Sequence, residues 1–139
     1  MDLDKVLDTV VEIQKEHPDV YLGGSISLML QNVLSRKLGD VDLETQEKMY
    51  IRQILKAAPH VNVYTYYTED GVKYELLPNP SDYHQDKSYV EYNYKENILR
   101  LVPAERIIKV KEKYILNPKC SDPQKHIDDI NNYYNKLNK

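Results

Sequence analysis

The sequence lacks tryptophan and phenylalanine and contains a single cysteine, Cys120. One cysteine excludes an intramolecular disulfide framework and is typical of a reducing compartment. Long apolar runs are absent too. None approaches the roughly 20 residues that a membrane-spanning helix needs, and Met1–Asp4 do not begin a signal peptide. We therefore expect a soluble, cytoplasmic protein with no membrane partner.

A strong excess of either charge is also missing, because the formal net charge is only -3. This balance excludes a global basic field and does not suggest a large nucleic-acid footprint, although a local basic patch stays open. The 139 residues suffice for one domain with a buried core and leave little room for a second. All aromatic residues are tyrosines, 13 in number, which either pack the core or follow the base composition of the encoding genome.

Glycine is scarce, yet two of the four glycines are adjacent in the stretch from 21 to 44, YLGGSISLMLQNVLSRKLGDVDLE. Its pattern predicts a strand, a turn, an apolar helix and a second strand. Gly23 and Gly24 can adopt backbone angles that other residues avoid and let a ligand approach the main chain, toward which the next helix would direct its N–H groups. Ser25 adds a hydroxyl and a candidate N-cap. The turn is a candidate phosphate site.

Two carboxylates follow this helix on the second strand. Side chains of a strand alternate between its faces, so Asp40 and Asp42 lie on one face while Val41 and Leu43 lie on the other. Like charges this close repel unless a cation lies between them. Carboxylate oxygens without a cysteine or histidine cluster favour Mg²⁺ or Mn²⁺, and Mg²⁺ commonly shares its ligands between carboxylates and substrate phosphates. The stretch therefore predicts phosphoryl-transfer chemistry.

The order of strand, Gly-Gly-Ser, helix and Asp-Val-Asp-Leu resembles the signature of the nucleotidyltransferase superfamily, the polymerase-beta-like fold. This superfamily includes antibiotic nucleotidyltransferases, CCA-adding enzymes and toxins of several toxin–antitoxin systems. The longer pattern LGGSISLML...SRKLGDVDL looks most like the toxin-like and small-molecule branches. One departure is visible, because the spacing from Ser25 to Asp40 is slightly longer than the commonest family spacing.

The resemblance implies roles for single residues. Gly24 and Ser25, with Gly23 beside them, match the turn that holds the triphosphate. Asp40 and Asp42 match the pair that binds divalent metal.

Two further matches concern basic and acidic positions. Arg36 matches a basic residue ahead of the metal pair. Glu75, in the segment VKYELL, matches the third carboxylate, which completes the metal site or helps to activate the acceptor hydroxyl. Aspartate is commoner at this position, and glutamate is one methylene longer.

The resemblance also implies the fold. We expect an α+β protein with the minimal nucleotidyltransferase fold, in which a mixed sheet of about five strands packs against helices. Residues 1–139 form a single domain, with the catalytic core at 1–102 and a C-terminal helical part at 103–139. The periodicity predicts helices at 2–17, 25–37, 45–58, 104–116 and 121–137, and strands at 20–22, 40–43, 61–67, 72–77, 89–94 and 98–102.

Two other regions carry candidate contacts. The segment 78–88 is expected to be a loop in which Tyr83, His84 and Lys87 either contact an acceptor or base or are simply solvated. The C-terminal segment has a second resemblance to small family members, and this implies that Lys111 or Lys125 reaches the triphosphate or the acceptor.

The C-terminal charges also have a structural interpretation, namely a solvent-exposed helix face rich in charge. In that interpretation His126 and Asp129 form an ordinary i,i+3 pair. Zinc is not expected, since His126 has no partner histidine nearby.

We therefore expect a Mg²⁺- or Mn²⁺-dependent nucleotidyltransferase that moves NMP from a nucleoside triphosphate to an acceptor hydroxyl. The acceptor is a small molecule, an RNA end or a protein side chain, and analogy with small family members suggests a homodimer. One alternative is a non-catalytic member of the fold that binds nucleotides or proteins in a toxin–antitoxin or phage context. Another is an unrelated α+β structural protein, in which the carboxylates would face apart.

Overall fold

The computed structural model describes residues 1–34, 39–45, 47, 49–56, 60–77 and 88–138. Several residues predicted above to contact substrate lie outside these ranges. They are Arg36, Tyr83, His84 and Lys87.

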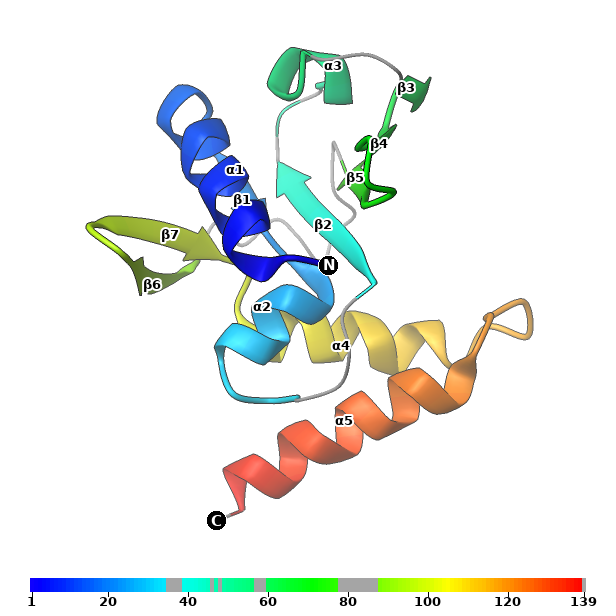
Figure 1. Cartoon of the computed structure of the whole chain (residues 1–139). Coiled ribbons are helices and arrows are strands. Elements are labelled where there is room, and N and C mark those ends of the chain that lie inside the picture. Colours follow the sequence, from blue (N-terminus) through cyan, green and yellow to red (C-terminus); the bar gives the residue numbers. More distant parts are fainter. Residues whose placement is uncertain (35–38, 46, 48, 57–59, 78–87, 139) are drawn as a thin grey trace.

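Within the described ranges, a seven-stranded mixed sheet forms the centre of the protein (Figure 1). The strands are β1 (Val20–Leu22), β2 (Asp40–Thr45), β3 (His60–Asn62), β4 (Thr65–Tyr67), β5 (Lys73–Leu77), β6 (Val90–Tyr94) and β7 (Asn97–Leu101). Their order is β3-β4-β5-β2-β1-β7-β6. The pairs β2/β5 and β1/β7 are parallel, and the other neighbours are antiparallel. The predicted α+β class with a mixed sheet is confirmed.

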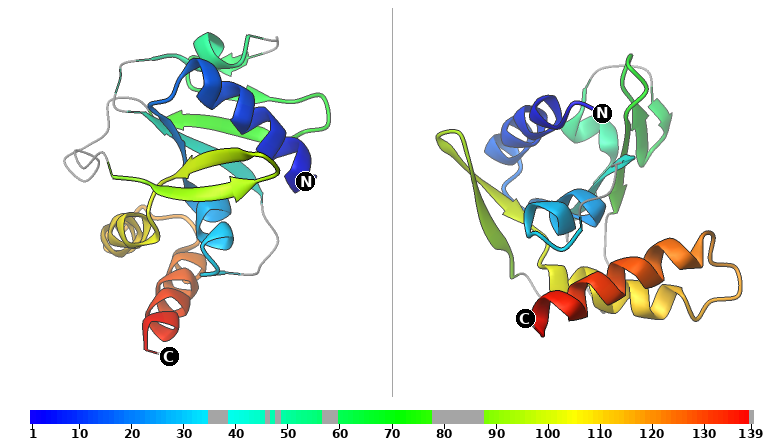
Figure 2. Two further views of the ribbon diagram at one scale, coloured as in Figure 1. Left: turned by 90° about the vertical axis from the view of Figure 1, so that its left-hand side faces the viewer. Right: turned by 60° about the horizontal axis from the view of Figure 1, so that its bottom comes forward.

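Five helices accompany this sheet in the described part of the chain. They are α1 (Leu3–Glu16), α2 (Gly24–Leu30), α3 (Ile51–Ile54), α4 (Ala104–Tyr114) and α5 (Pro123–Leu137). Figures 1 and 2 show α4 and α5 side by side, on the side of the molecule away from α1. The predicted C-terminal helices are confirmed. No helix among the described residues has the length and apolar character needed to cross a membrane.

The core determines which face of β2 carries the carboxylates. Val41 and Leu43 are fully buried in a cluster that includes Val10 of α1. Because neighbouring side chains of a strand point to opposite faces, Asp40 and Asp42 lie on the face away from this cluster. Burial of the apolar half of the strand therefore orients the polar half.

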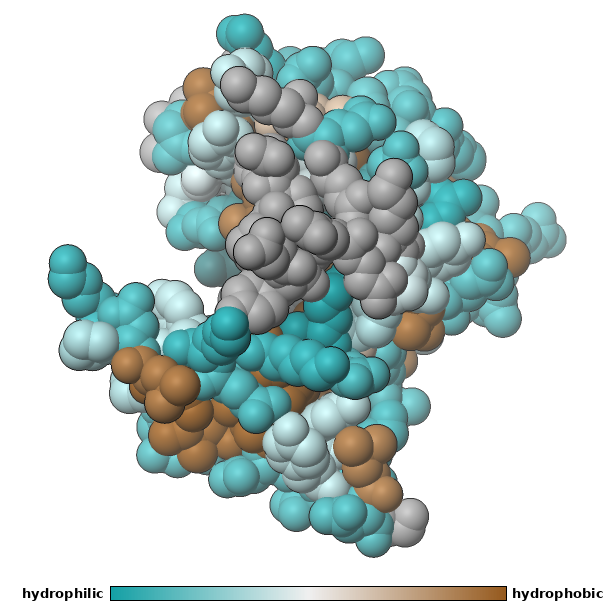
Figure 3. Space-filling model, turned by 180° about the vertical axis from the view of Figure 1, so that it is seen from behind, coloured by the Kyte–Doolittle hydropathy of each residue, from teal (hydrophilic) through white to brown (hydrophobic). Residues whose placement is uncertain are grey.

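A second apolar cluster joins α4 to the end of α2. Leu28 of α2 and Ile108 of α4 are almost completely buried in it, and Ile130 and Tyr133 of α5 pack against it. Apart from the grey residues, the surface seen from behind in Figure 3 is mostly hydrophilic, and its larger apolar areas gather low in the molecule, at the level of α4 and α5. The C-terminal helices are thus attached to the sheet through α2.

Two predicted elements are wrong. In place of a helix at 45–58, β2 continues to Thr45, which pairs with Val20 of β1, and α3 spans only four residues. Pairing with a neighbouring strand outweighs local helical periodicity here. In place of one strand at 61–67, a tight turn separates β3 from β4, where the Tyr64 N–H donates to Asn62 Oδ1 at 2.8 Å. The additional strand contributes to a sheet larger than the predicted five.

Two helix termini also differ from prediction. Helix α2 ends at Leu30 and not at residue 37, because Asn32 adopts a left-handed conformation with φ of 63°. Residues 35–38 lie outside the described ranges. Helix α4 begins at Ala104, as predicted, but ends at Tyr114 and not at residue 116.

Candidate functional site

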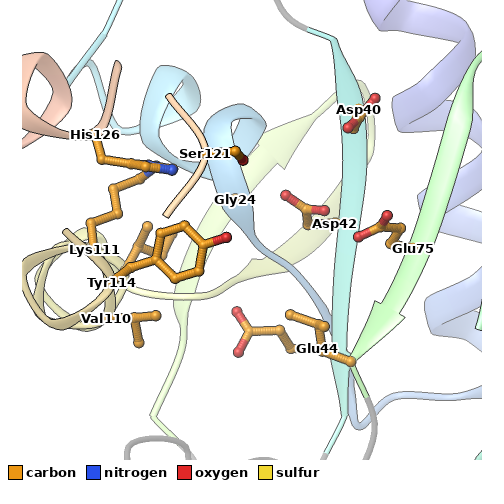
Figure 4. A pocket seen from close by; sticks show the side chains of 12 residues that line it. Gly24, Asp40, Asp42, Glu44, Glu75, Val110, Lys111, Tyr114, Ser121 and His126 are labelled. Atoms are coloured by element: carbon orange, nitrogen blue, oxygen red, sulfur yellow. The ribbon is translucent and has the colours of Figure 1, made fainter. Parts of the chain in front are cut away.

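Two neighbouring parallel strands bring the predicted carboxylates together. In the register of β2 and β5, Asp42 lies opposite Glu75 and Asp40 lies opposite Lys73. Asp40, Asp42 and Glu75 all line one pocket (Figure 4). The register between two strands far apart in the sequence therefore brings Asp40, Asp42 and Glu75 together. These three carboxylates form the acidic wall of the pocket.

The pocket lies between this acidic wall and the C-terminal helices, and its volume is about 510 Å³. In Figure 4, Lys111, Tyr114 and His126 lie across from Asp42 and Glu75. The described lining residues are Gly24, Asp40, Asp42, Glu44, Glu75, Leu77, Ile107, Val110, Lys111, Tyr114, Ser121 and His126. One wall of the pocket is acidic, and the other carries the ammonium group of Lys111.

The glycine turn packs directly against the acidic strand. The Gly23 N–H donates to the Asp42 backbone carbonyl at 2.8 Å. Gly24 lines the pocket in a left-handed conformation, with φ of +59°. The predicted N-cap at Ser25 is wrong, because Gly23 is the N-cap of α2. Gly23 and Ser25 are not among the described lining residues.

Like charges crowd Asp42. Burial is the largest cause that raises its pKa, the Glu75 carboxylate is the next, and the pKa reaches about 6. Asp40 and Glu44 act in the same direction, and Lys111 opposes them. Each additional negative charge disfavours the ionised form of Asp42, so a bound cation would relieve the repulsion.

Glu75 already has a cationic neighbour. It forms an ion pair with Lys73, two residues earlier on the same face of β5. This carboxylate raises the pKa of Lys73 through a hydrogen bond and through its charge. Lys73 therefore competes with any cation for Glu75.

The opposite wall is built by α4 and α5. Lys111 Nζ lies 3.2 Å from Asp129 Oδ2 and 2.9 Å from His126 Nδ1. His126 and Asp129 thus share Lys111 on the other helix as a partner. Lys125 is exposed on α5 and is not among the described lining residues. Of the two predicted lysines, the structure brings Lys111 to the pocket.

The acidic wall suits a hard divalent cation in its chemistry. All of its donors are carboxylate oxygens, which Mg²⁺ and Mn²⁺ prefer. Within the described residues, no three acidic, imidazole or thiol side chains already lie close enough to enclose a metal ion. Burial and the neighbouring carboxylates raise the pKa of Asp42 in spite of the opposing charge of Lys111, so a cation bound here would favour its ionised form.

Sequence reasoning missed several residues of the pocket. Glu44 lies two positions after Asp42, and the same alternation that grouped Asp40 with Asp42 predicts it. Lys73, which is not among the described lining residues but forms an ion pair with Glu75, has the same relation to that residue. Tyr114 and Ser121 carried no signal in the sequence, because only the packing of α4 and α5 brings them to the pocket.

The fold of the protein is nucleotidyltransferase-like. A solved structure that it resembles is that of an antigenic nucleotidyltransferase-like protein from Paracoccidioides brasiliensis. The TM-score is 0.64 at 17% sequence identity, and the match covers 94% of this chain and 74% of that chain. At this identity the likeness shows the fold alone. No protein-family model and no curated protein matches the sequence.

Proposed function

We propose that the protein is a nucleotidyltransferase that moves NMP from a nucleoside triphosphate to an acceptor hydroxyl and depends on a divalent cation. One observation carries the proposal: Asp40, Asp42 and Glu75 share one wall of a pocket whose other wall holds Lys111. An acidic wall for a cation and a basic wall for phosphates are the two requirements of this reaction. The nucleotidyltransferase-like fold supports it.

The acidic wall and the glycine turn would divide the work between metal and phosphate. Asp40 and Asp42 would hold one or two Mg²⁺ or Mn²⁺ ions, which would supply positive charge beside the attacking and leaving oxygens of an in-line displacement. Gly24, at the pocket, lets a phosphate approach the main chain, with Ser25 next to it. Glu75 would join the metal site and accept the proton of the acceptor hydroxyl.

The transfer itself makes one P–O bond and breaks another. The acceptor oxygen attacks the α-phosphorus and forms a new P–O bond, and its proton passes to the Glu75 carboxylate. The bond between the α-phosphorus and the bridging oxygen breaks, and pyrophosphate leaves with that electron pair. Lys111, across the pocket, faces the developing negative charge. The acceptor is a small molecule, an RNA end or a protein side chain.

A thermal-shift titration tests the proposal. ATP, GTP, CTP and UTP are each added with and without Mg²⁺ to wild type, to the double variant Asp40→Asn/Asp42→Asn, and to Asp128→Asn. Asp128 is an exposed carboxylate on α5, so its variant is a matched control. We expect a Mg²⁺-dependent rise in Tm with at least one nucleotide, lost only in the double variant, because a ligand that binds the folded state stabilises it. No shift with any nucleotide would contradict the proposal.

A second function, nucleotide binding without turnover, is favoured by one observation. Lys73 already neutralises Glu75 through an ion pair. In this case the nucleotide would still raise Tm, but no pyrophosphate would be released from any nucleoside triphosphate. A coupled assay for pyrophosphate, run on the same samples as the thermal-shift titration, separates the two functions.

A further inference from the structure

A buried ion pair supports the basic wall of the pocket. Asp129 on α5 is 1% exposed, and its Oδ2 lies 3.2 Å from Nζ of Lys111 on α4. His126 Nδ1 lies 2.9 Å from the same Nζ. Lys111 and His126 line the pocket, whereas Asp129 is not among the described lining residues. The carboxylate contacts the ammonium group but is itself shielded from the pocket.

The charge of Lys111 determines the tautomer of His126. An ammonium group only donates hydrogen bonds, so Nδ1 of the neutral ring accepts and Nε2 carries the proton. Burial, followed by the charges of Lys111 and Lys125, lowers the pKa of His126. The carboxylates of Asp129 and Asp122 act in the opposite direction without reversing this shift. The imidazole is therefore neutral at pH 7 and holds Lys111 from a second side.

Two costs explain why a lysine at this wall needs such partners. The side chain of Lys111 is only 11% exposed, and burial favours the neutral amine unless a counter-charge is close. A lysine side chain is also flexible, so its ammonium group has no fixed position without partners. Asp129 meets both needs, although its negative charge weakens the attraction of Lys111 for anions.

We propose that Asp129 is a positioning residue, which holds the ammonium group of Lys111 charged and in place where it receives the pyrophosphate leaving group. This inference rests on the proposed function, because pyrophosphate is the leaving group of that reaction. His126 shares the positioning role through Nδ1. Neither the spacing of these residues nor their composition assigns this function, since Asp129 lies 18 positions after Lys111 on another helix.

The test measures binding of inorganic pyrophosphate, with Mg²⁺ present, by calorimetry at pH 6.5 and pH 8.5. Asp129→Asn keeps the shape of the side chain but removes the charge that favours the ammonium form of Lys111. We expect its Kd, relative to wild type at the same pH, to rise roughly 5- to 10-fold at pH 8.5 and much less at pH 6.5, because the pKa of the buried lysine falls. Ratios taken at one pH cancel the ionisation of pyrophosphate itself.

Two further variants make the result specific. Asp128→Asn, at the adjacent exposed position, should leave the Kd unchanged at both pH values. In a Lys111→Met background, Asp129→Asn should have no additional effect, because the residue acts through Lys111. If Asp129 served only to cancel charge, Asp129→Asn would tighten binding at both pH values. That result, or an equal loss in both backgrounds, would overturn the proposal.

A measurement on wild type covers the case in which Asp129→Asn does not fold. The ¹⁵N resonance of Lys111 Nζ should shift when pyrophosphate and Mg²⁺ are added, and an unchanged resonance would overturn the proposal. Failure of the proposed function is distinguishable from this outcome. Pyrophosphate binding with the expected pH dependence but without nucleotidyl transfer would contradict the enzyme proposal and leave the role of Asp129 intact.

Discussion

The side chain of Asp42 fills the space into which a side chain at Gly24 would project. A Cβ atom at Gly24 would lie 2.1 Å from Asp42 Oδ2. The backbone of Gly24 has φ of +59°, which L residues rarely adopt. Two features therefore require glycine at this position. One is the positive φ, and the other is the close approach of the turn to the Asp42 side chain.

Gly24→Ala should therefore lower stability and displace the Asp42 carboxylate. We expect a loss of about 3 kcal/mol in the free energy of unfolding, from the positive φ and from the steric clash together. Gly71→Ala is the matched control, because Gly71 has φ of +84° and a Cβ atom there would meet nothing within 4 Å. It should lose only about 1 to 2 kcal/mol. Urea denaturation measures both, and equal losses would show that the contact with Asp42 does not matter.

Asp42→Asn should stabilise the metal-free protein at neutral pH. The folded-state pKa of Asp42 is raised to about 6, so its contribution to stability is complete below about pH 4 and is lost as pH rises through about 6. In EDTA at pH 7.5 the variant should gain on the order of 1 to 2 kcal/mol over wild type, and at pH 4 the two should be equal. Denaturant titrations at both pH values measure the difference. A gain that is the same at pH 4 would contradict the assignment.

Lys73→Gln should make Glu75 available to a divalent cation. The ion pair is about one-third exposed on both sides, so its loss alone should cost less than about 1 kcal/mol of stability. We expect the Mg²⁺ concentration for half-maximal nucleotide-induced stabilisation to fall about 2- to 5-fold, since Lys73 no longer competes. Lys95→Gln, at an exposed ion pair on the β6–β7 hairpin, is the control. An unchanged Mg²⁺ requirement would argue that Glu75 does not contact the metal.

Gln14→Leu should destabilise the junction of β1 and β7. The buried Gln14 amide donates to the carbonyls of Val20 and Arg100, both at 2.9 Å, and accepts from the Arg100 N–H at 3.0 Å. Leucine would leave these backbone groups without partners, and we expect a loss of about 2 to 4 kcal/mol in the free energy of unfolding. Gln124→Leu, on the exposed face of α5, should change stability little. A small effect at both positions would show that the Gln14 hydrogen bonds do not stabilise this junction.

Local patterns in the sequence predicted the helices and strands that bury one face and expose the other. The apolar spacing at 2–17 predicted α1, and the patterns at 72–77, 89–94 and 98–102 predicted β5, β6 and β7. Prediction failed where a segment pairs with a distant strand. Residues 45–58 have helical periodicity, yet Thr45 continues β2 because Val20 lies opposite it in β1.

The acidic wall was largely determined by sequence. The alternation Asp40-Val41-Asp42-Leu43 is enough to place both carboxylates on one face, since a strand must bury its apolar side. That Glu75 joins them was an expectation from family resemblance. The parallel register of β2 and β5, which is a long-range property, brought it opposite Asp42.

The basic wall was decided by tertiary structure alone. Lysines at 111 and 125 are equivalent in the sequence, and each lies on an amphipathic helix rich in charge. The packing of α4 against α5 buries Lys111 beside Asp129 and leaves Lys125 exposed. Periodicity describes one helix at a time, whereas the contact depends on the distance and rotation between two helices. The sequence therefore determined where the acidic wall lies, and only the fold decided which lysine faces that wall.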